Sequence, residues 1–148
     1  MVGFAARMTF VEDYDPSLPP TVGDADQLLQ VVQNLLKNAA QAAGNAGGII
    51  RLRTFYDISL RLRRADGTGR PLPLQIEVID DGPGIPPEIA GEIFEPFVSG
   101  RGNGTGLGLA LVSKIISDHG GWIAVDSVPG RTAFRVSLPV APKSLESP

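Results

Sequence analysis

The longest periodic segment of the chain predicts an amphipathic helix at residues 24–43. Its apolar side chains recur with the period of an α-helix that lies on a core. Asp24 can cap this helix, Gln27 completes a capping-box pattern, and Gly44 is placed to end it. A second apolar repeat from Leu107 to Ile116, followed by a pair of glycines, predicts another helix.

Short segments in which apolar and polar residues alternate predict the strands, and most are bounded by residues that favour turns. We expect an edge strand at Ala6–Val11, strands at Ile49–Phe55, Ile58–Leu62 and Leu74–Ile79, and a closing hairpin of Trp122–Ser127 and Thr132–Leu138. Asp13–Gly23 and Ala65–Pro73 are rich in turn formers and predict connecting loops. From Ala141 onward we expect a disordered tail.

These elements predict one domain over residues 1–140, followed by the tail at 141–148. Their order indicates a two-layer α/β (α+β) sandwich, in which helices pack on one face of a mixed, mostly antiparallel sheet. The length of 148 residues and the apolar content of 43% suit a single core.

Charge and composition exclude several classes of function. The net charge of −3 offers no broad basic face, so we expect neither nucleic acid nor an anionic membrane as a partner. There is no cysteine, and a single histidine cannot build a metal cluster. No apolar run approaches the ~20 residues that span a bilayer. A cytoplasmic protein fits this composition best.

Three amide side chains share one face of the first predicted helix. Gln30, Asn34 and Asn38 follow one another at four-residue spacing beside the apolar stripe. A solvated helix face usually carries Lys and Glu, and Asn is only a middling helix former. Amide oxygens can hold Mg²⁺, which proteins often share with substrate phosphates. From the helix alone, amides that brace a neighbouring loop are an equal alternative.

A glycine-rich loop follows the strand that ends at Asp80. Gly82, Gly84 and Ile85 let the backbone approach a ligand closely, while the Asp80 carboxylate can point into the site. Such a carboxylate can accept a hydrogen bond from the exocyclic amine of adenine, where guanine has a carbonyl oxygen. A simple turn capped by Asp80 or Asp81 is the alternative.

A second glycine-rich loop precedes the second predicted helix. Its residues are Gly104, Thr105, Gly106, Leu107 and Gly108. Backbone N–H groups and the positive end of a helix can meet phosphate oxygens there. A flexible loop is the alternative for this motif alone, and neither a P-loop nor a Rossmann fingerprint fits the sequence.

Four further side chains can be placed from their surroundings. We expect Phe94 and Phe97 to pack on the core. Arg101, in the connector between the loops, can reach a terminal phosphate or stay solvated. We expect His119 to satisfy terminal carbonyls of the second helix and not to act in catalysis.

With these motifs in this order, the chain resembles the catalytic ATP-binding domain of sensor histidine kinases from about Met8 to Pro139. The segments DYDPSLP, NLLKNAAQA and FVSGRGNGTGLGL are most similar to the nitrogen-regulation sensor kinases. The resemblance implies the Bergerat sandwich fold, ATP and Mg²⁺. It implies Asn38 as the metal ligand, Asn34 beside it, Asp80 on adenine, and Gly104–Gly108 along the phosphates.

The position of Asn34 bears on the reaction. Related ATP-hydrolysing families carry a Glu four residues before the metal-binding Asn, whereas this chain has Asn34 there. An amide cannot take a proton at neutral pH, so the chain favours transfer to an already nucleophilic imidazole. Many sensor kinases also have Lys or Arg where this chain has Gln41, which leaves Lys37 or Arg101 to neutralise phosphate charge.

The resemblance also implies partners. A helix hairpin with a phosphoacceptor histidine is absent, and His119 lies in the wrong context to replace it. We therefore expect a monomeric fragment that binds Mg·ATP and, in a longer parent protein, phosphorylates a histidine on a dimerisation domain that serves a response regulator. A hydrolysing ATPase of the same fold and a non-enzymatic nucleotide-sensing module are the alternatives.

Overall fold

The computed structural model describes residues 8–43, 47–59, 61–63, 69–94 and 108–142. Its main sheet has the strand order β1-β2-β5-β7-β6. The strands are β1 (Met8–Asp13), β2 (Gly48–Tyr56), β5 (Leu74–Asp80), β6 (Trp122–Val128) and β7 (Arg131–Leu138). β1 pairs with β2 in parallel, and the other neighbours are antiparallel.

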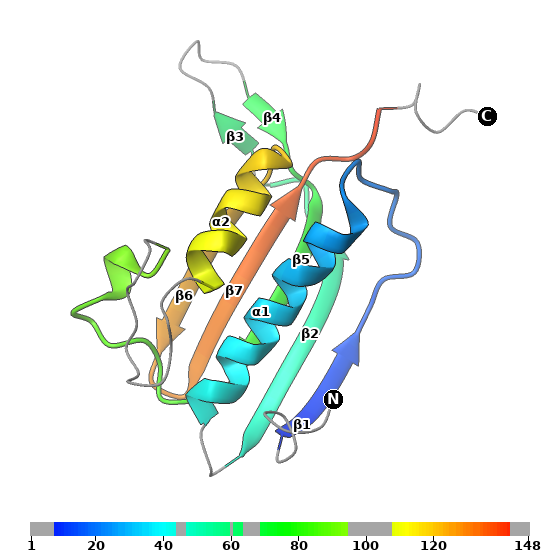
Figure 1. Cartoon of the computed structure of the whole chain (residues 1–148). Coiled ribbons are helices and arrows are strands. Elements are labelled where there is room, and N and C mark those ends of the chain that lie inside the picture. Colours follow the sequence, from blue (N-terminus) through cyan, green and yellow to red (C-terminus); the bar gives the residue numbers. More distant parts are fainter. Residues whose placement is uncertain (1–7, 44–46, 60, 64–68, 95–107, 143–148) are drawn as a thin grey trace.

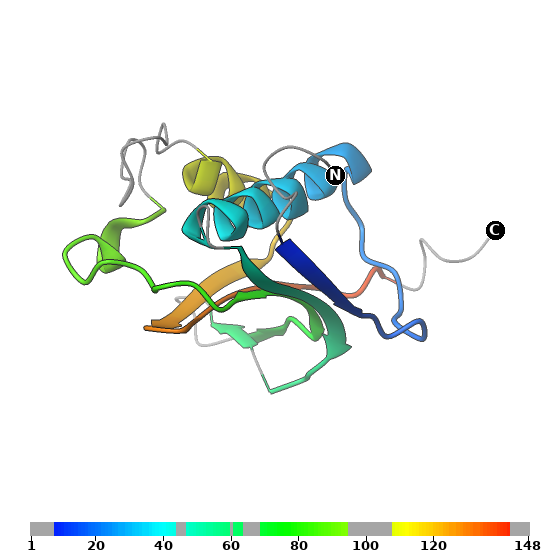
Figure 2. The ribbon, with the colours of Figure 1, turned by 90° about the horizontal axis from the view of Figure 1, so that it is seen from below.

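Two helices, α1 (Ala25–Ala43) and α2 (Gly108–Asp118), cover one face of this sheet, as Figures 1 and 2 show. The predicted two-layer sandwich is therefore confirmed. The core lies between the layers because α1 and α2 bury their apolar stripes against alternate residues of the strands. Its fully buried members include Val31, Leu35, Ile50, Val78, Val112, Ile116, Phe134 and Val136.

The start of α1 confirms one half of the predicted capping box. Asp24 Oδ1 accepts the N–H of Gln27 at 3.1 Å. The reciprocal bond is different, because the N–H of Asp24 donates to Nε2 of His119 at 3.0 Å and not to the side chain of Gln27. The expected end at Gly44 lies outside the described residues.

The segment between β2 and β5 differs from the prediction. The N–H of Ser59 donates to Asp57 Oδ1 at 2.9 Å, so a turn occupies the start of the predicted strand Ile58–Leu62. Strand β3 (Arg61–Arg63), which overlaps the end of the predicted strand, pairs with β4 (Gly69–Pro71) in a separate two-stranded sheet. Only β4 falls within the predicted loop Ala65–Pro73. Alternation in the sequence marked a strand here but could not show that it leaves the main sheet.

The sheet face away from the helices carries an ion-pair network around Glu77, whose side chain is 6% exposed. Arg53 donates to Glu77 at 2.8 Å, and Arg135 donates at 3.0 and 3.1 Å. Both guanidinium groups lie over the ring of Phe55, at 4.7 and 5.2 Å from its centre. Asp57 lies 3.8 Å from Arg135, and its pKa is lowered mainly by hydrogen bonds from Ser59. The network ties β2, β5 and β7 together.

The ordered structure of the chain continues beyond the end of β7. Ala141, the first residue of the predicted tail, is buried, and its N–H donates to the carbonyl of Pro20 at 2.8 Å. Ala141 therefore belongs to the ordered domain and not to a disordered tail, and 143–148 lie outside the described residues. Within the described part of the chain, neither helix has the length and apolar character needed to cross a membrane.

Candidate functional site

Asp80 ends β5 on the face of the sheet that the helices cover. It pairs with Ile50 of β2 and with Thr132 of β7, and it is only 3% exposed. Its Oδ1 accepts the N–H of Gly82 at 2.9 Å, so the carboxylate also shapes the turn that follows. A buried carboxylate at the end of a strand can accept a hydrogen bond from a ligand amine.

The neighbouring carboxylate, Asp81, has a different place. It is exposed, and its Oδ1 accepts the N–H of Ile49 at 3.0 Å. Asp81 therefore fastens the start of β2, while Asp80 faces the layer of helices. The sequence alone left open which of the two carboxylates caps the turn, and the structure gives each a bond of its own.

The amide row of α1 runs toward the Asp80 turn. Asn34, Asn38 and Ala42 follow one another at four-residue spacing and share one helix face. A Cβ atom added to Gly82 would lie 3.4 Å from both the Cβ and the carbonyl oxygen of Ala42. Asn38 lies four residues before Ala42, about 6 Å along the helix axis at a rise of ~1.5 Å per residue. The structure thus places half-buried Asn38 near the Asp80 turn, with half-buried Asn34 one helical turn further from it.

The glycine turn after Asp80 packs against the β6–β7 hairpin. Gly84 has a φ of +93°, and a Cβ atom there would lie 3.0 Å from the carbonyl oxygen of Val128. Only glycine fits this position without strain. The N–H of Gly130 donates to the carbonyl of Gly82 at 2.9 Å, which holds the turn and the hairpin together.

Two hydroxyl side chains join this cluster without having been predicted. Thr132 pairs with Asp80 and is 4% exposed. Its Oγ1 lies 2.8 Å from Ser127 Oγ, which accepts the N–H of Ile85 at 2.9 Å. No local sequence signal marks them, because they reach Asp80 only through a strand order in which β7 lies between β5 and β6.

The predicted phosphate-binding residues are placed only in part. Gly108 is exposed at the first residue of α2, which starts at the same end of the molecule where α1 finishes (Figure 1). Lys37 is exposed on α1. Arg101 and the loop residues Gly104, Thr105, Gly106 and Leu107 lie outside the described residues.

These residues fit a nucleotide with its metal. The buried oxygen of Asp80 is an acceptor for an amine, and the amide oxygens of Asn34 and Asn38 are hard ligands of the kind Mg²⁺ prefers. The start of α2 supplies the positive end of a helix dipole for phosphate. Such a site can bind a triphosphate, and its binding groups come from three separate elements, α1, β5 and α2.

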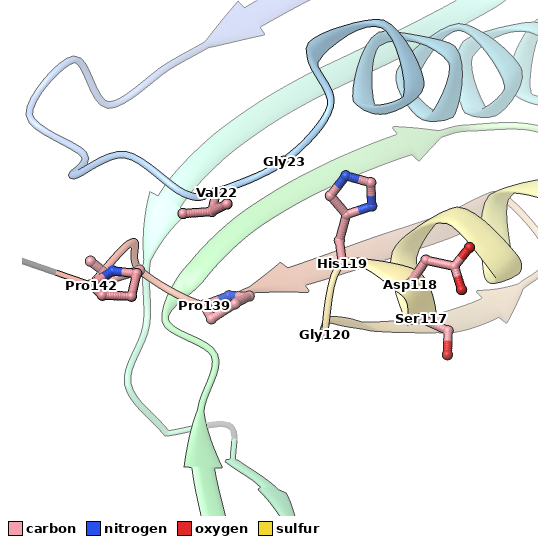
Figure 3. A pocket seen from close by; sticks show the side chains of 9 residues that line it. Val22, Gly23, Ser117, Asp118, His119, Gly120, Pro139 and Pro142 are labelled. Carbon is pink, nitrogen blue, oxygen red and sulfur yellow. The ribbon is translucent and has the colours of Figure 1, made fainter. Parts of the chain in front are cut away.

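The opposite end of the molecule has a shallow hollow of about 460 Å³ (Figure 3). It is lined by the end of α2 around His119, by the segment before α1 and by the segment after β7. His119 Nδ1 lies 2.7 Å from the carbonyl oxygen of Ile115, so its predicted role at the helix end is confirmed. The predicted structural role also holds for Phe94, whose ring meets Phe134 edge to face at 6.2 Å. Phe97 lies outside the described residues.

The sequence of this chain matches a known family. Residues 23–142 match the family described as "Histidine kinase-, DNA gyrase B-, and HSP90-like ATPase". The chain is 76% identical over 144 residues to the sensory histidine kinase/phosphatase NtrB of Rhodobacter capsulatus, covering 97% of this chain and 40% of that protein. It is 52% identical to NtrB of Azospirillum brasilense, covering 93% of this chain and 35% of that protein. The chain thus spans well under half the length of these relatives.

Solved structures agree with the sequence match. The mycobacterial sensor histidine kinase MprB superposes with a TM-score of 0.73 at 29% identity, over 93% of this chain and 85% of that one. The catalytic domain of histidine kinase ThkA gives 0.71 at 30% identity, over 92% and 82%. Full-length ShkA in complex with AMPPNP gives 0.69 at 27% identity, over 89% and 25%. The chain therefore belongs to the histidine kinase-, DNA gyrase B- and HSP90-like ATPase family, as an ATP-binding catalytic domain of the NtrB sensor-kinase type.

Proposed function

We propose that this domain binds Mg·ATP at the Asp80 end of the sandwich and transfers the γ-phosphoryl group to a histidine on a separate dimerisation domain of its parent protein. One observation carries the proposal. Ala42 of α1 lies against Gly82, and Asn38 precedes Ala42 by four residues on the same helix face, close to the turn that holds the buried Asp80. ShkA, a structural relative, is in complex with an ATP analogue, which supports the choice of nucleotide.

Each group has one task in this proposal. Asp80 accepts a hydrogen bond from the adenine amine, beside Gly82, Gly84 and Ile85. Asn38 would hold Mg²⁺, with Asn34 next to it, and a bound metal would supply positive charge against the phosphates. Phosphates lie along Gly104–Gly108, where α2 begins, and Lys37 or Arg101 meets the terminal phosphate.

The reaction asks for positioning more than for acid–base chemistry. An imidazole nitrogen of the acceptor histidine forms a bond to the γ-phosphorus as the bond between that phosphorus and the bridging oxygen breaks, and ADP leaves with the electron pair. Asn34 stands where the hydrolysing families have a Glu, and an amide cannot activate water as a general base. The histidine nucleophile needs no such base.

The relatives support a proposal for the activity of the parent protein. NtrB proteins carry the name of sensory histidine kinase/phosphatase, and the chain spans 40% of one of them. We assign the parent the same kind of role in two-component nitrogen regulation, in the cytoplasm, with a response regulator as the final acceptor.

Reconstituted phosphotransfer tests the proposal. The chain is mixed with the histidine-bearing dimerisation domain of its parent, magnesium and ATP labelled at the γ-phosphate. We expect acid-labile label on the dimerisation domain, and none when its histidine is replaced or when the chain carries Asn38→Ala. ATP binding without any transfer to the dimerisation domain would refute the kinase assignment and leave a nucleotide-sensing module.

A further inference from the structure

Ser127 and Thr132 form a hydrogen-bonded chain beside Asp80. We infer that Ser127 fixes the direction of the Thr132 hydroxyl and thereby sets part of the preference of the pocket for adenine over guanine. The inference rests on the proposed function, because it refines the way in which the same pocket reads the purine. Ser127 is a positioning residue that acts through Thr132.

The series of hydrogen bonds begins at a group that can only donate, the backbone N–H of Ile85. The N–H of Ile85 donates to Ser127 Oγ at 2.9 Å, and Ser127 Oγ lies 2.8 Å from Thr132 Oγ1. Each hydroxyl has one proton, so only one of the two donates in this contact. The other hydroxyl keeps its proton for a different partner.

Asp80 decides which hydroxyl donates. Thr132 and Asp80 are paired across β5 and β7. Directly opposed residues of antiparallel strands have Cβ atoms about 4.5–5.5 Å apart. Asp80 supplies acceptor oxygens, so a Thr132 proton directed into the pocket beside it places a donor next to an acceptor, where the ring nitrogen of a purine can accept it. Ser127 then donates to Thr132, and the bonds of the chain all run one way and reinforce one another.

A fixed direction discriminates between purines. Adenine presents an amine donor beside a ring-nitrogen acceptor, whereas guanine presents a carbonyl acceptor beside a ring N–H donor. An acceptor at Asp80 next to a donor at Thr132 complements adenine and opposes guanine. Without Ser127 the Thr132 hydroxyl can rotate and serve either purine.

The test compares affinities for ATP and GTP. Both dissociation constants are measured calorimetrically with magnesium for the chain and for Ser127→Ala. We expect the preference for ATP to fall about fivefold, the size of one neutral hydrogen bond. Ser127→Thr keeps the hydroxyl and should restore the preference. Ser137→Ala is the matched control, because this buried hydroxyl donates to Gln75 on the opposite sheet face.

A second variant shows whether Ser127 acts through Thr132. Thr132→Val keeps the shape of the side chain, and in its background Ser127→Ala should not change the preference further. If Ser127→Ala weakens ATP and GTP equally, the serine only anchors Ile85 and the inference is overturned. An unmodified chain that does not bind ATP would overturn the proposed function as well as the inference, whereas selective binding left intact by Ser127→Ala overturns the inference alone.

Discussion

Two adjacent carboxylates, Asp80 and Asp81, differ in what they can do because they point away from each other. Asp80, the last residue of β5, faces the helices and is 3% exposed, whereas Asp81 follows the strand, is exposed and accepts the N–H of Ile49. The buried position strengthens any hydrogen bond that Asp80 makes to a ligand. A substitution that changes only charge and donor character can therefore separate the two.

Asp80→Asn should lower the preference for ATP over GTP by at least about tenfold, the lower range for a hydrogen bond to a charged group. The new amide can donate to the guanine carbonyl, which the carboxylate cannot. Competition of ATP and GTP against a fluorescent nucleotide measures the preference. Asp81→Asn is the matched control and should behave as the unmodified chain does. Retained selectivity in Asp80→Asn would remove Asp80 from purine recognition.

The residues of the site that the sequence predicts are those with a local signal. Asn34 and Asn38 stand out because two aligned amides are unusual on a helix, and Asp80 because glycines follow it directly. Thr132 and Ser127 carry no such signal. Their contact with the site depends on β7 lying beside β5, a long-range pairing that periodicity does not reveal.

Helices α1 and α2 run in opposite directions. At the end of the sandwich away from Asp80, the side chain of His119 joins the start of α1 to the end of α2. The N–H of Asp24 donates to His119 Nε2 at 3.0 Å, so this nitrogen is an acceptor and the ring proton is on Nδ1. Nδ1 then donates to the carbonyl oxygen of Ile115 at 2.7 Å. One imidazole thus satisfies the start of α1 and the end of α2.

His119→Ala should lower the free energy of unfolding by about 1–3 kcal/mol, because an N–H and a carbonyl at two helix ends lose their partner. Urea denaturation followed by circular dichroism measures the change. Lys114→Ala on the same helix removes only an exposed pair with Asp118 at 3.0 Å and should change stability by less than about 1 kcal/mol. Equal effects of the two substitutions would show that His119 does not fasten the helices.

As with the residues of the site, the elements that carry a local sequence signal were predicted, and features that depend on long-range contacts were not. Both helices and the main strands follow from periodicity, since each buries one face against a shared core. Alternation predicted a strand that overlaps β3, but it did not reveal that a turn at Asp57 and Ser59 separates this strand from β2, and β4 was missed because its residues were read as a loop. The reciprocal capping bond was missed because His119 is far away in sequence, and a local rule had assigned the N–H of Asp24 to Gln27.

Across the whole molecule, the site joins parts that are distant in sequence. The end of α1, the turn after β5, the β6–β7 hairpin and the start of α2 meet at one end of the sandwich (Figure 1). Hydrogen bonds already connect the turn with the hairpin. A ligand that bridges these parts binds only the folded chain, so it should stabilise the entire domain and not one element.

Mg·ATP should therefore raise the free energy of unfolding, by about 2.7 kcal/mol at a free concentration one hundred times its dissociation constant. The part of this gain that needs magnesium should vanish in Asn38→Ala, because the amide oxygen no longer holds the metal. Thermal unfolding with ATP, in magnesium and in a chelator, separates the two parts. Gln33→Ala, an exposed amide on the opposite side of α1, should keep the full magnesium-dependent gain. If Asn38→Ala also kept it, the metal would be held by other groups, and the amide row would serve only to brace the Asp80 turn.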